Sequence, residues 1–290
     1  MRYDETKPAY VDWGDGTSYE AKSDLQQLVH EYAAQGEYVV KLYNLKSIAV
    51  SAFNATWRNK ESYVAFTLKE VTCLGELVSE VQDMAFFRCK ALEAASLPLS
   101  LPSVGAMAFR GCRNLKRVDL PAAERLGKGL CWECSSLQEA EVQEGTKKIG
   151  NYAFRDCTSL TTVSLPASVE HVEQDAFSGC SSIEVFNVAE GSKHYVSCSG
   201  ALMTADKKTL VHGTTHSAEV PEGAEEVGDW AFYAASLSSI SLPQSLKKVG
   251  HCAFAGCSKL EELLLPSGLQ TVGRAAFMES GLAEADLRST

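Results

Sequence analysis

The stretch "AFRGCRNLKRVDLP", residues 108–121, recurs as "AFRDCTSLTTVSLP" at 153–166 and as "AFAGCSKLEELLLP" at 253–266. Each copy starts with an Ala-Phe pair, carries a cysteine three residues after the phenylalanine, and ends on spaced apolar residues followed by proline. The spacing predicts a short strand, and proline ends it because proline cannot donate to a strand ladder. The sequence is therefore an array of repeats with a period of about 23 residues.

The phenylalanine of the Ala-Phe pair, called the marker below, identifies the further copies. Cys131 fills the marker position of a repeat hidden between Phe109 and Phe154. The wide gap between Phe177 and Phe232 leaves room for one normal repeat and an insertion of roughly 32 residues. The markers are Phe86, Phe109, Phe154, Phe177, Phe232, Phe254 and Phe277.

A single repeat cannot bury so many apolar positions, whereas stacked coils can, which predicts a solenoid. With strands about 4.8 Å apart, roughly nine coils would form a rod or arc of about 40 Å. The fold class that we predict is a repeat solenoid with short parallel strands and turns.

The unit A-F-x-x-C-x-x-L-x-x-V-x-L-P resembles the BspA-type leucine-rich repeat of bacterial and protozoan surface proteins, from about Ser47 to Leu287. The resemblance implies a right-handed leucine-rich-repeat solenoid of the α/β class, with turns or short helical segments opposite the strands. The segment "YVSCSGALMTADKKTLVHG", residues 195–213, resembles a variant of this family in which a β-hairpin interrupts one coil. We therefore expect a β-hairpin insert around residues 190–220.

The N-terminal stretch "VDWGDGT", residues 11–17, with "HEYAAQGEYVVKLY", residues 30–43, resembles part of a polycystic-kidney-disease-type β-sandwich. This resemblance implies a small β cap over residues 1–46, followed directly by the solenoid over residues 47–290. Asp12 and Asp15 supply too few carboxylates for the oxygen shell of calcium, so we expect no metal and no cofactor.

Composition limits the partners and the location. The net charge of −10 repels a phosphate backbone, which argues against nucleic acid as a partner. No apolar run approaches the roughly 20 residues of a membrane-spanning helix. The first residues lack the basic start and apolar core of a signal peptide, which leaves a cytoplasmic protein or a mature or truncated chain.

Most of the ten cysteines share one repeat position, three residues after the marker. Coils in register would align them as a buried ladder of reduced thiols that behave as small apolar side chains. A ladder spreads its thiols along an axis, whereas a metal site needs ligands that converge and a disulfide needs inclined side chains. The "CWEC" pair is then a marker position and a ladder position. The predicted ladder consists of Cys89, Cys112, Cys134, Cys157, Cys180 and Cys257.

In each predicted strand, the two residues that flank the central apolar residue should point outward onto a concave sheet. Two interpretations stay open: a solvated polar face, or a binding face for a protein or glycoprotein. The candidate positions are Arg117, Asp119, Glu139, Glu141, Thr162, Ser164, Val185, Asn187, Ser239, Ser241, Glu262, Leu264, Glu284 and Asp286.

Aromatic residues near the coil edges, namely Trp132, Tyr152, Trp230 and Tyr233, are either contact anchors or side chains buried between coils. The family resemblance implies a non-enzymatic protein-binding or adhesion module of an extracellular microbial surface protein. An intracellular protein-interaction scaffold is the alternative. A thiol-dependent enzyme that uses Cys252 or Cys131 is a third hypothesis.

Overall fold

The computed structural model describes residues 2–3, 9–21, 41–43, 45–48, 70–74, 80–215, 217 and 219–282. The protein is a β-solenoid of about eight turns with parallel strands, as the repeats predict, and the described residues include no helix. Turns therefore occupy the side opposite the strands, where the sequence left turns or short helical segments open.

The N-terminal strands continue the solenoid sheet, which runs in the order β3-β2-β4-β6-β8-β9. β2 pairs antiparallel with β3 and β4, and β4 pairs parallel with β6. Residues 22–40, which carry part of the resemblance to a polycystic-kidney-disease-type module, lie outside the described residues, so that resemblance stays a prediction. The strands are β1 (Arg2–Tyr3), β2 (Ala9–Asp12), β3 (Ser18–Ala21), β4 (Lys41–Tyr43), β5 (Leu45–Ile48), β6 (Glu70–Leu74) and β7 (Glu80–Val81).

Residues 80–194 form what we call the N-terminal arm, whose coils stack in parallel register. Ala140, Val163 and Phe186 lie side by side in three consecutive coils, all buried. One side carries β8 (Ala94–Ser96), β9 (Arg117–Asp119), β11 (Glu139–Glu141), β13 (Thr162–Leu165) and β15 (Val185–Val188). A second side carries β10 (Arg125–Leu126), β12 (Lys148–Ile149) and β14 (His171–Val172).

The Ala-Phe turns form the third side of each coil, called the turn edge below. Alternate backbone N–H groups donate to the next coil, as from Phe86 to the Ala108 carbonyl at 2.7 Å and from Phe109 to the Leu130 carbonyl at 2.8 Å. The intervening N–H groups close tight turns within their own coil, as from Phe87 to the Met84 carbonyl. The turn edge is thus hydrogen-bonded between coils without being a strand.

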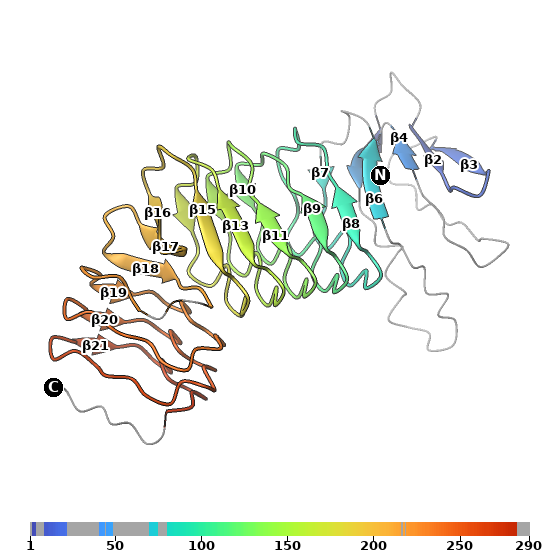
Figure 1. Cartoon of the computed structure of the whole chain (residues 1–290). Coiled ribbons are helices and arrows are strands. Elements are labelled where there is room, and N and C mark those ends of the chain that lie inside the picture. Colours follow the sequence, from blue (N-terminus) through green and yellow to red (C-terminus); the bar gives the residue numbers. More distant parts are fainter. Residues whose placement is uncertain are drawn as a thin grey trace.

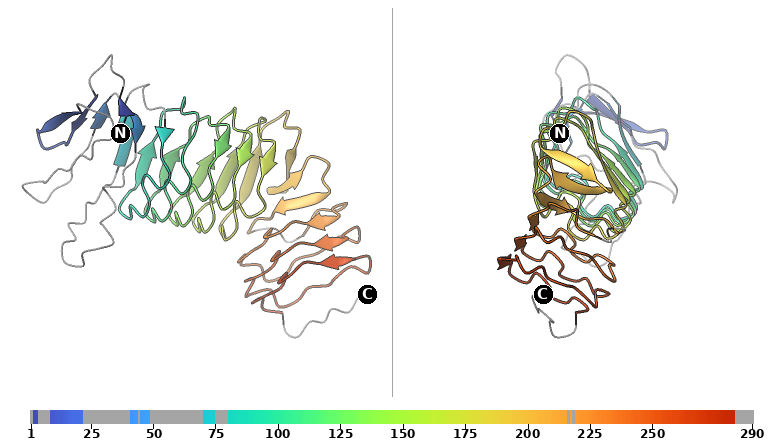
Figure 2. Two further views of the ribbon diagram at one scale, coloured as in Figure 1. Left: turned by 180° about the vertical axis from the view of Figure 1, so that it is seen from behind. Right: turned by 60° about the vertical axis from the view of Figure 1, so that its left-hand side comes forward.

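A three-stranded antiparallel segment interrupts the stack: β16 (Tyr195–Cys198), β17 (Ala201–Thr204) and β18 (Thr209–His212). β18 then pairs parallel with β19 (Glu226–Val227), which continues through β20 (Lys248–Val249) to β21 (Thr271–Val272). The stack changes direction at this segment (Figures 1 and 2). We call residues 195–215 the joint and residues 217 and 219–282 the C-terminal arm.

The joint separates two hydrophobic cores. Leu202 and Val211 pack into the core of the N-terminal arm, whereas Met203 and Leu210 pack into that of the C-terminal arm. Successive side chains of a strand point to opposite faces, so β17 and β18 bury both faces. This two-sided burial makes the inserted strands a partition between the arms.

Marker phenylalanines stack along each arm. The ring centroids of Phe86 and Phe109 are 5.0 Å apart, and the two rings are inclined by 7°. The rings of Phe154 and Phe177 stack at 5.3 Å. Cys131 lies between these two pairs and is fully buried. The N-terminal stack is therefore interrupted by a small side chain.

The thiols of the predicted ladder make a specific contact that their repeat position did not foretell. Five of the six Sγ atoms donate to the carbonyl of the marker residue one coil earlier, as from Cys112 to Phe86 at 3.0 Å and from Cys180 to Phe154 at 2.9 Å. Cys134, Cys157 and Cys257 make the equivalent bond at 3.0 to 3.1 Å. The cysteines from Cys89 to Cys257 are all free.

Candidate protein-interaction surfaces

The strand positions expected to point outward lie on two separate faces. In the N-terminal arm, register places Glu139 beside Thr162 and Val185, on a face that is largely polar. Arg117 on this face bonds Asp119 at 2.9 Å. Arg117, Glu139, Glu141 and Asn187 are exposed, whereas Asp119, Thr162, Ser164 and Val185 are half-buried.

The second group lies on the C-terminal arm, beyond the joint. Ser239, Ser241, Glu262 and Leu264 are exposed, and Ser239 bridges to Glu262 in the next coil. Leu264 is 74% exposed. Glu284 and Asp286 lie outside the described residues. The joint therefore interrupts the face that the repeat pattern suggested.

A different surface lies on the turn edge. The marker side chain enters the core, while the residue after it is partly exposed: Phe86 is buried and Phe87 is not. The same holds for Phe109 and Arg110. Cationic and aromatic residues collect at this position and beside it on the turn edge. We call the set the arginine–aromatic ridge: Phe87, Arg88, Arg110, Lys128, Trp132, Tyr152, Arg155, Trp230, Tyr233 and His251.

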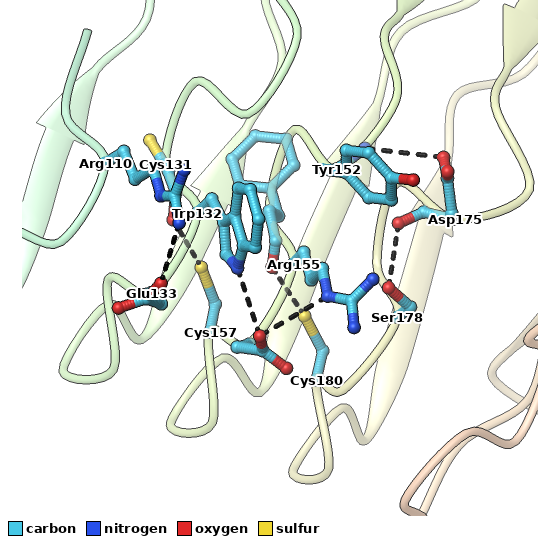
Figure 3. A network of polar contacts seen from close by, with 12 residues as sticks. Arg110, Cys131, Trp132, Glu133, Tyr152, Arg155, Cys157, Asp175, Ser178 and Cys180 are labelled. Carbon is cyan, nitrogen blue, oxygen red and sulfur yellow. Dashed lines mark hydrogen bonds and ion pairs between the residues drawn. The ribbon is translucent and has the colours of Figure 1, made fainter. Parts of the chain in front are cut away.

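The central contacts of the ridge are shown in Figure 3. The Arg110 guanidinium carbon lies 3.5 Å from the centre of the Trp132 ring, which is a stacking distance. The Trp132 and Tyr152 rings are 5.5 Å apart. The Trp132 Nε1–H donates to Asp156 Oδ2 at 3.1 Å, which fixes the indole at the surface.

Arg155 connects the two arms. Its guanidinium carbon is 5.7 Å from the ring centre of Trp132 and 5.3 Å from that of Tyr152. It also lies 5.5 Å from Trp230 and 5.8 Å from Tyr233, both in the C-terminal arm. The ridge thus continues across the bend.

The coil between these contacts has small residues at the edge. Ser178 and Gly179 are both buried, and a Cβ at Gly179 would collide with the Asp156 carboxylate. Beyond the bend, the Trp230 ring packs against Tyr233 at 4.9 Å and against His251 at 5.3 Å. The aromatic side chains of the C-terminal arm therefore support each other as well as Arg155.

The carboxylates of the ridge are engaged within the protein. Glu133 pairs with Arg110 at 3.4 Å and with Arg113 at 3.5 Å. Asp175 accepts hydrogen bonds from the Asn151 side chain and the Tyr152 backbone. By contrast, within the described ranges neither Arg88 nor Lys128 has a carboxylate at ion-pair distance, and each lies over a ring, that of Phe87 at 5.1 Å and that of Tyr152 at 5.7 Å.

Sequence reasoning found part of this ridge. It left open whether the four aromatic residues are anchors or are buried between coils, and all four are half-exposed at the turn edge. It missed Phe87, Arg110 and Arg155. The available signal was their shared position directly after the marker.

The thiols offer poor nucleophiles. Cys131 is fully buried, and Cys252 is only 3% exposed although its turn position suggested exposure. Burial raises the pKa of Cys252, whose Sγ lies 3.4 Å from His251 Nε2. A raised pKa lowers the thiolate fraction, which is the opposite of what a nucleophilic cysteine needs.

The described ranges contain neither a candidate metal centre nor a candidate membrane-spanning helix. No group of three or more His, Cys, Asp or Glu side chains there is placed to hold a metal ion. No helix long and apolar enough to cross a membrane occurs in that part of the chain.

The model of the BspA type leucine rich repeat region matches residues 46–184 and 213–290, in six copies. The unmatched residues between these ranges contain β15 to β18, which include the joint strands. No curated protein sequence matches the chain.

Two solved structures have a similar fold. The pneumococcal vaccine antigen PcpA gives a TM-score of 0.59 at 20% identity, over 80% of this chain and 64% of that one. A leucine-rich repeat protein from Eubacterium ventriosum gives a TM-score of 0.51 at 18% identity, over 68% of this chain and 56% of that one. The chain therefore spans less than two thirds of either structure, and at these identities the likeness concerns the fold alone.

Proposed function

Because the chain belongs to the BspA-type leucine-rich repeat family, we propose that it is a non-enzymatic protein-binding module and that the arginine–aromatic ridge is its contact surface. Solenoids offer extended surfaces to their partners, and the ridge extends over both arms. The buried thiols with raised pKa values support a role without thiol catalysis.

The observation that carries this proposal is the composition and exposure of the ridge. Trp, Tyr and Arg are the residues most enriched where a few side chains supply most of the binding energy. Here Trp132, Tyr152 and Arg155 are held half-exposed by mutual contacts, which lowers the entropy cost of ordering them on binding.

The strand face of the N-terminal arm is a second proposed contact surface, as the repeat pattern suggested. Glu139 and Glu141 are exposed there on one strand. The face has small polar side chains at its centre and no aromatic residue among its outward positions on β9, β11, β13 and β15. We therefore rank it below the ridge.

We further propose adhesion at a microbial cell surface as the setting. The similar fold of a pneumococcal vaccine antigen supports this location. An intracellular scaffold is the second candidate, and the free cysteines favour it because reduced thiols are usual in reducing compartments. Antibody labelling of intact and of permeabilised source cells distinguishes the two: labelling that requires permeabilisation contradicts the surface location.

The contact surface can be tested with three immobilised proteins: the wild type, the ridge variant W132A/Y233A and the strand-face variant E139K/E141K. Each is exposed to a matrix-protein extract, and the retained proteins are quantified by mass spectrometry. We expect a shared set retained by the wild type and the strand-face variant and depleted on the ridge variant. Thermal unfolding of all three checks that they are folded. Equal retention by the folded ridge variant contradicts the proposal.

A further inference from the structure

The cations of the ridge follow one another along the turn edge. Arg88, Arg110, Lys128 and Arg155 belong to four consecutive coils, since each falls about one repeat after the last. With coils about 4.8 Å apart, the four side chains span roughly 14 Å. An extended peptide of about five residues covers that length.

Aromatic rings hold these cations in place. Arg110 stacks on Trp132, Arg155 lies among four rings, and Arg88 and Lys128 each lie over one ring. Stacking uses the flat face of a guanidinium, whereas its N–H donors lie in the plane, so stacking leaves donors for a carboxylate. Arg110 gives one N–H to Glu133 and Arg155 gives its Nε–H to Asp156, each at 3.4 Å, so the cations are pre-positioned and their remaining donors stay available.

The carboxylates of the ridge are engaged within the protein, whereas some of its cations are not. Glu133 and Asp175 accept hydrogen bonds from neighbouring coils, and Asp156 accepts from Trp132. Arg88 and Lys128 are exposed and have no ion pair within the residues that the structure describes. The ridge therefore offers cations to a partner in a protein whose net charge is −10.

From this arrangement we infer that the arginine–aromatic ridge binds an extended, carboxylate-rich segment of a partner protein. Carboxylates of the segment pair with Arg88, Lys128 and Arg155, and its aliphatic stems lie on the rings of Phe87, Trp132 and Tyr152. Carboxylate–guanidinium pairs are the strong, geometrically specific kind of hydrogen bond. The inference rests on the proposed function, since it names the class of partner for the same surface.

Direct binding tests the inference. The probes are fluorescein-labelled peptides of about 12 residues that alternate Glu with Thr, and the same peptide with Gln in place of Glu. Fluorescence anisotropy is measured with the full chain at about 50 mM and about 300 mM salt. We expect binding of the Glu peptide that weakens with salt, and at least about tenfold weaker binding of the Gln peptide.

Variants locate the site. R88Q/K128Q removes two exposed cations and is expected to weaken Glu-peptide binding about tenfold, and R155Q is expected to weaken it several-fold. The matched control R117Q/R125Q removes two exposed cations from the other sides of the coils and should change binding less than about twofold. Arg155 contacts rings of both arms, so thermal unfolding is measured to show whether R155Q also destabilises the protein. R88Q/K128Q leaves this contact between the arms intact.

Several results overturn the inference: no binding of the Glu peptide, equal binding of the Gln peptide, or equal weakening by the control variant. Tighter binding of a single-stranded oligonucleotide of similar length also overturns it, because the site would then recognise phosphate. If the Glu peptide fails to bind while W132A/Y233A still loses retained proteins, the proposed function stands and only the partner class is wrong. If the Glu peptide binds at the ridge while W132A/Y233A retains every protein, the proposed function fails instead.

Discussion

The two arms are built from the same coil, but they differ in two features that join successive coils: the hydrogen-bonded thiol ladder and the stack of marker rings. In the N-terminal arm, consecutive thiols donate to marker carbonyls, but the stack of marker rings is broken at Cys131. In the C-terminal arm, three marker rings stack without a break, at 5.1 Å and 5.6 Å, while Ala235 occupies the first ladder position. Each arm therefore tolerates the loss of one support where the other is continuous.

The hydrogen bonds explain why a thiol can be lost. The Phe232 carbonyl already accepts the Ala235 N–H at 3.0 Å, as the Phe86 carbonyl accepts the Cys89 N–H at 3.1 Å. A carbonyl has two lone pairs, so the thiol of the next coil is its second donor. Removing a thiol leaves no marker carbonyl without a partner, whereas removing a ring leaves a cavity.

Between the arms both supports are replaced by other residues. The Gly213 N–H donates to the Ala231 carbonyl as a marker does, and His212 Nε2 lies 3.1 Å from the Phe177 carbonyl oxygen, in the place that a ladder thiol takes elsewhere. The His212 ring meets that of Phe177 at 80° instead of stacking. The joint thus keeps the hydrogen bonds between coils while it changes the orientation of the rings.

The largest effect is expected from Phe177→Ala. Phe177 is fully buried and packs against Phe154 in the N-terminal arm and His212 in the joint, so its loss should lower the free energy of unfolding by about 3–5 kcal/mol. Urea denaturation followed by circular dichroism measures the change. Phe277→Ala in the terminal coil is the control, since that ring is only partly buried and should cost less. Equal losses would contradict the dependence on burial.

Gly213→Ala should be the next largest. A Cβ at this position would lie 1.8 Å from Cε1 of the Phe232 ring, so the ring must move within a packed core. Overpacking of this kind typically costs about 1–3 kcal/mol. Gly268→Ala is the matched control, because its nearest contact would be an ordinary one at 3.5 Å. Similar stability of both variants would show that the Phe232 ring is not held tightly against Gly213.

These two positions illustrate how far sequence predicts the fold. The period placed Phe177 in the core, because a marker that recurs in every coil must face the shared interior. It gave no sign that Gly213 acts as a marker, since the residue type differs and only its hydrogen bond to Ala231 reveals the role. The bend was hidden for a related reason: Leu202 and Met203 are both apolar, and only the packing assigns them to different cores.

The ridge was predictable in part. Trp132 and Trp230 stand out as aromatic residues at coil edges, but the contact of Arg155 with Trp230 joins residues far apart in the sequence. Arg110 and Arg155 lie at the position after the marker. The residue type there varies from repeat to repeat, so it does not contribute to the repeat pattern. The sequence left open whether Trp132 is a contact anchor or is buried between coils, and its contacts with Arg110 and Asp156 hold it at the surface.

A smaller effect is expected from the thiol ladder. Cys157→Ala removes a buried sulfur and its bond to the Cys131 carbonyl, which should cost about 1–2 kcal/mol by urea denaturation. Cys157→Ser keeps a donor and separates the hydrogen bond from the lost volume. The control is Cys198→Ala at a half-buried position outside the ladder. A loss as large in the control would mean that the ladder position has no special role.

The smallest effect concerns His212 and depends on pH. Burial lowers the pKa of His212 below its usual range, against the opposing pull of the Gly213 and Phe177 carbonyls. In the unfolded chain the ring binds a proton near its ordinary pKa of about 6.5, whereas the folded ring stays neutral to lower pH. The unfolded state therefore binds more protons, and stability falls as pH drops below about 6.5.

His212→Gln removes this titration and can keep a donor to the Phe177 carbonyl. Between about pH 7 and about pH 5.5, we expect the wild type to lose about 1 kcal/mol more than this variant in urea denaturation. The two proteins differ only at position 212, so the difference isolates His212. The C-terminal arm has no counterpart, because Cys257 donates a thiol where the joint uses an imidazole. Parallel pH profiles of the two proteins would mean that His212 binds its proton equally well in the folded and the unfolded chain, against the effect of burial. A wild type that gains stability relative to the variant toward about pH 5.5 would mean instead that His212 is protonated in the folded joint, where both ring nitrogens then donate to the Gly213 and Phe177 carbonyls.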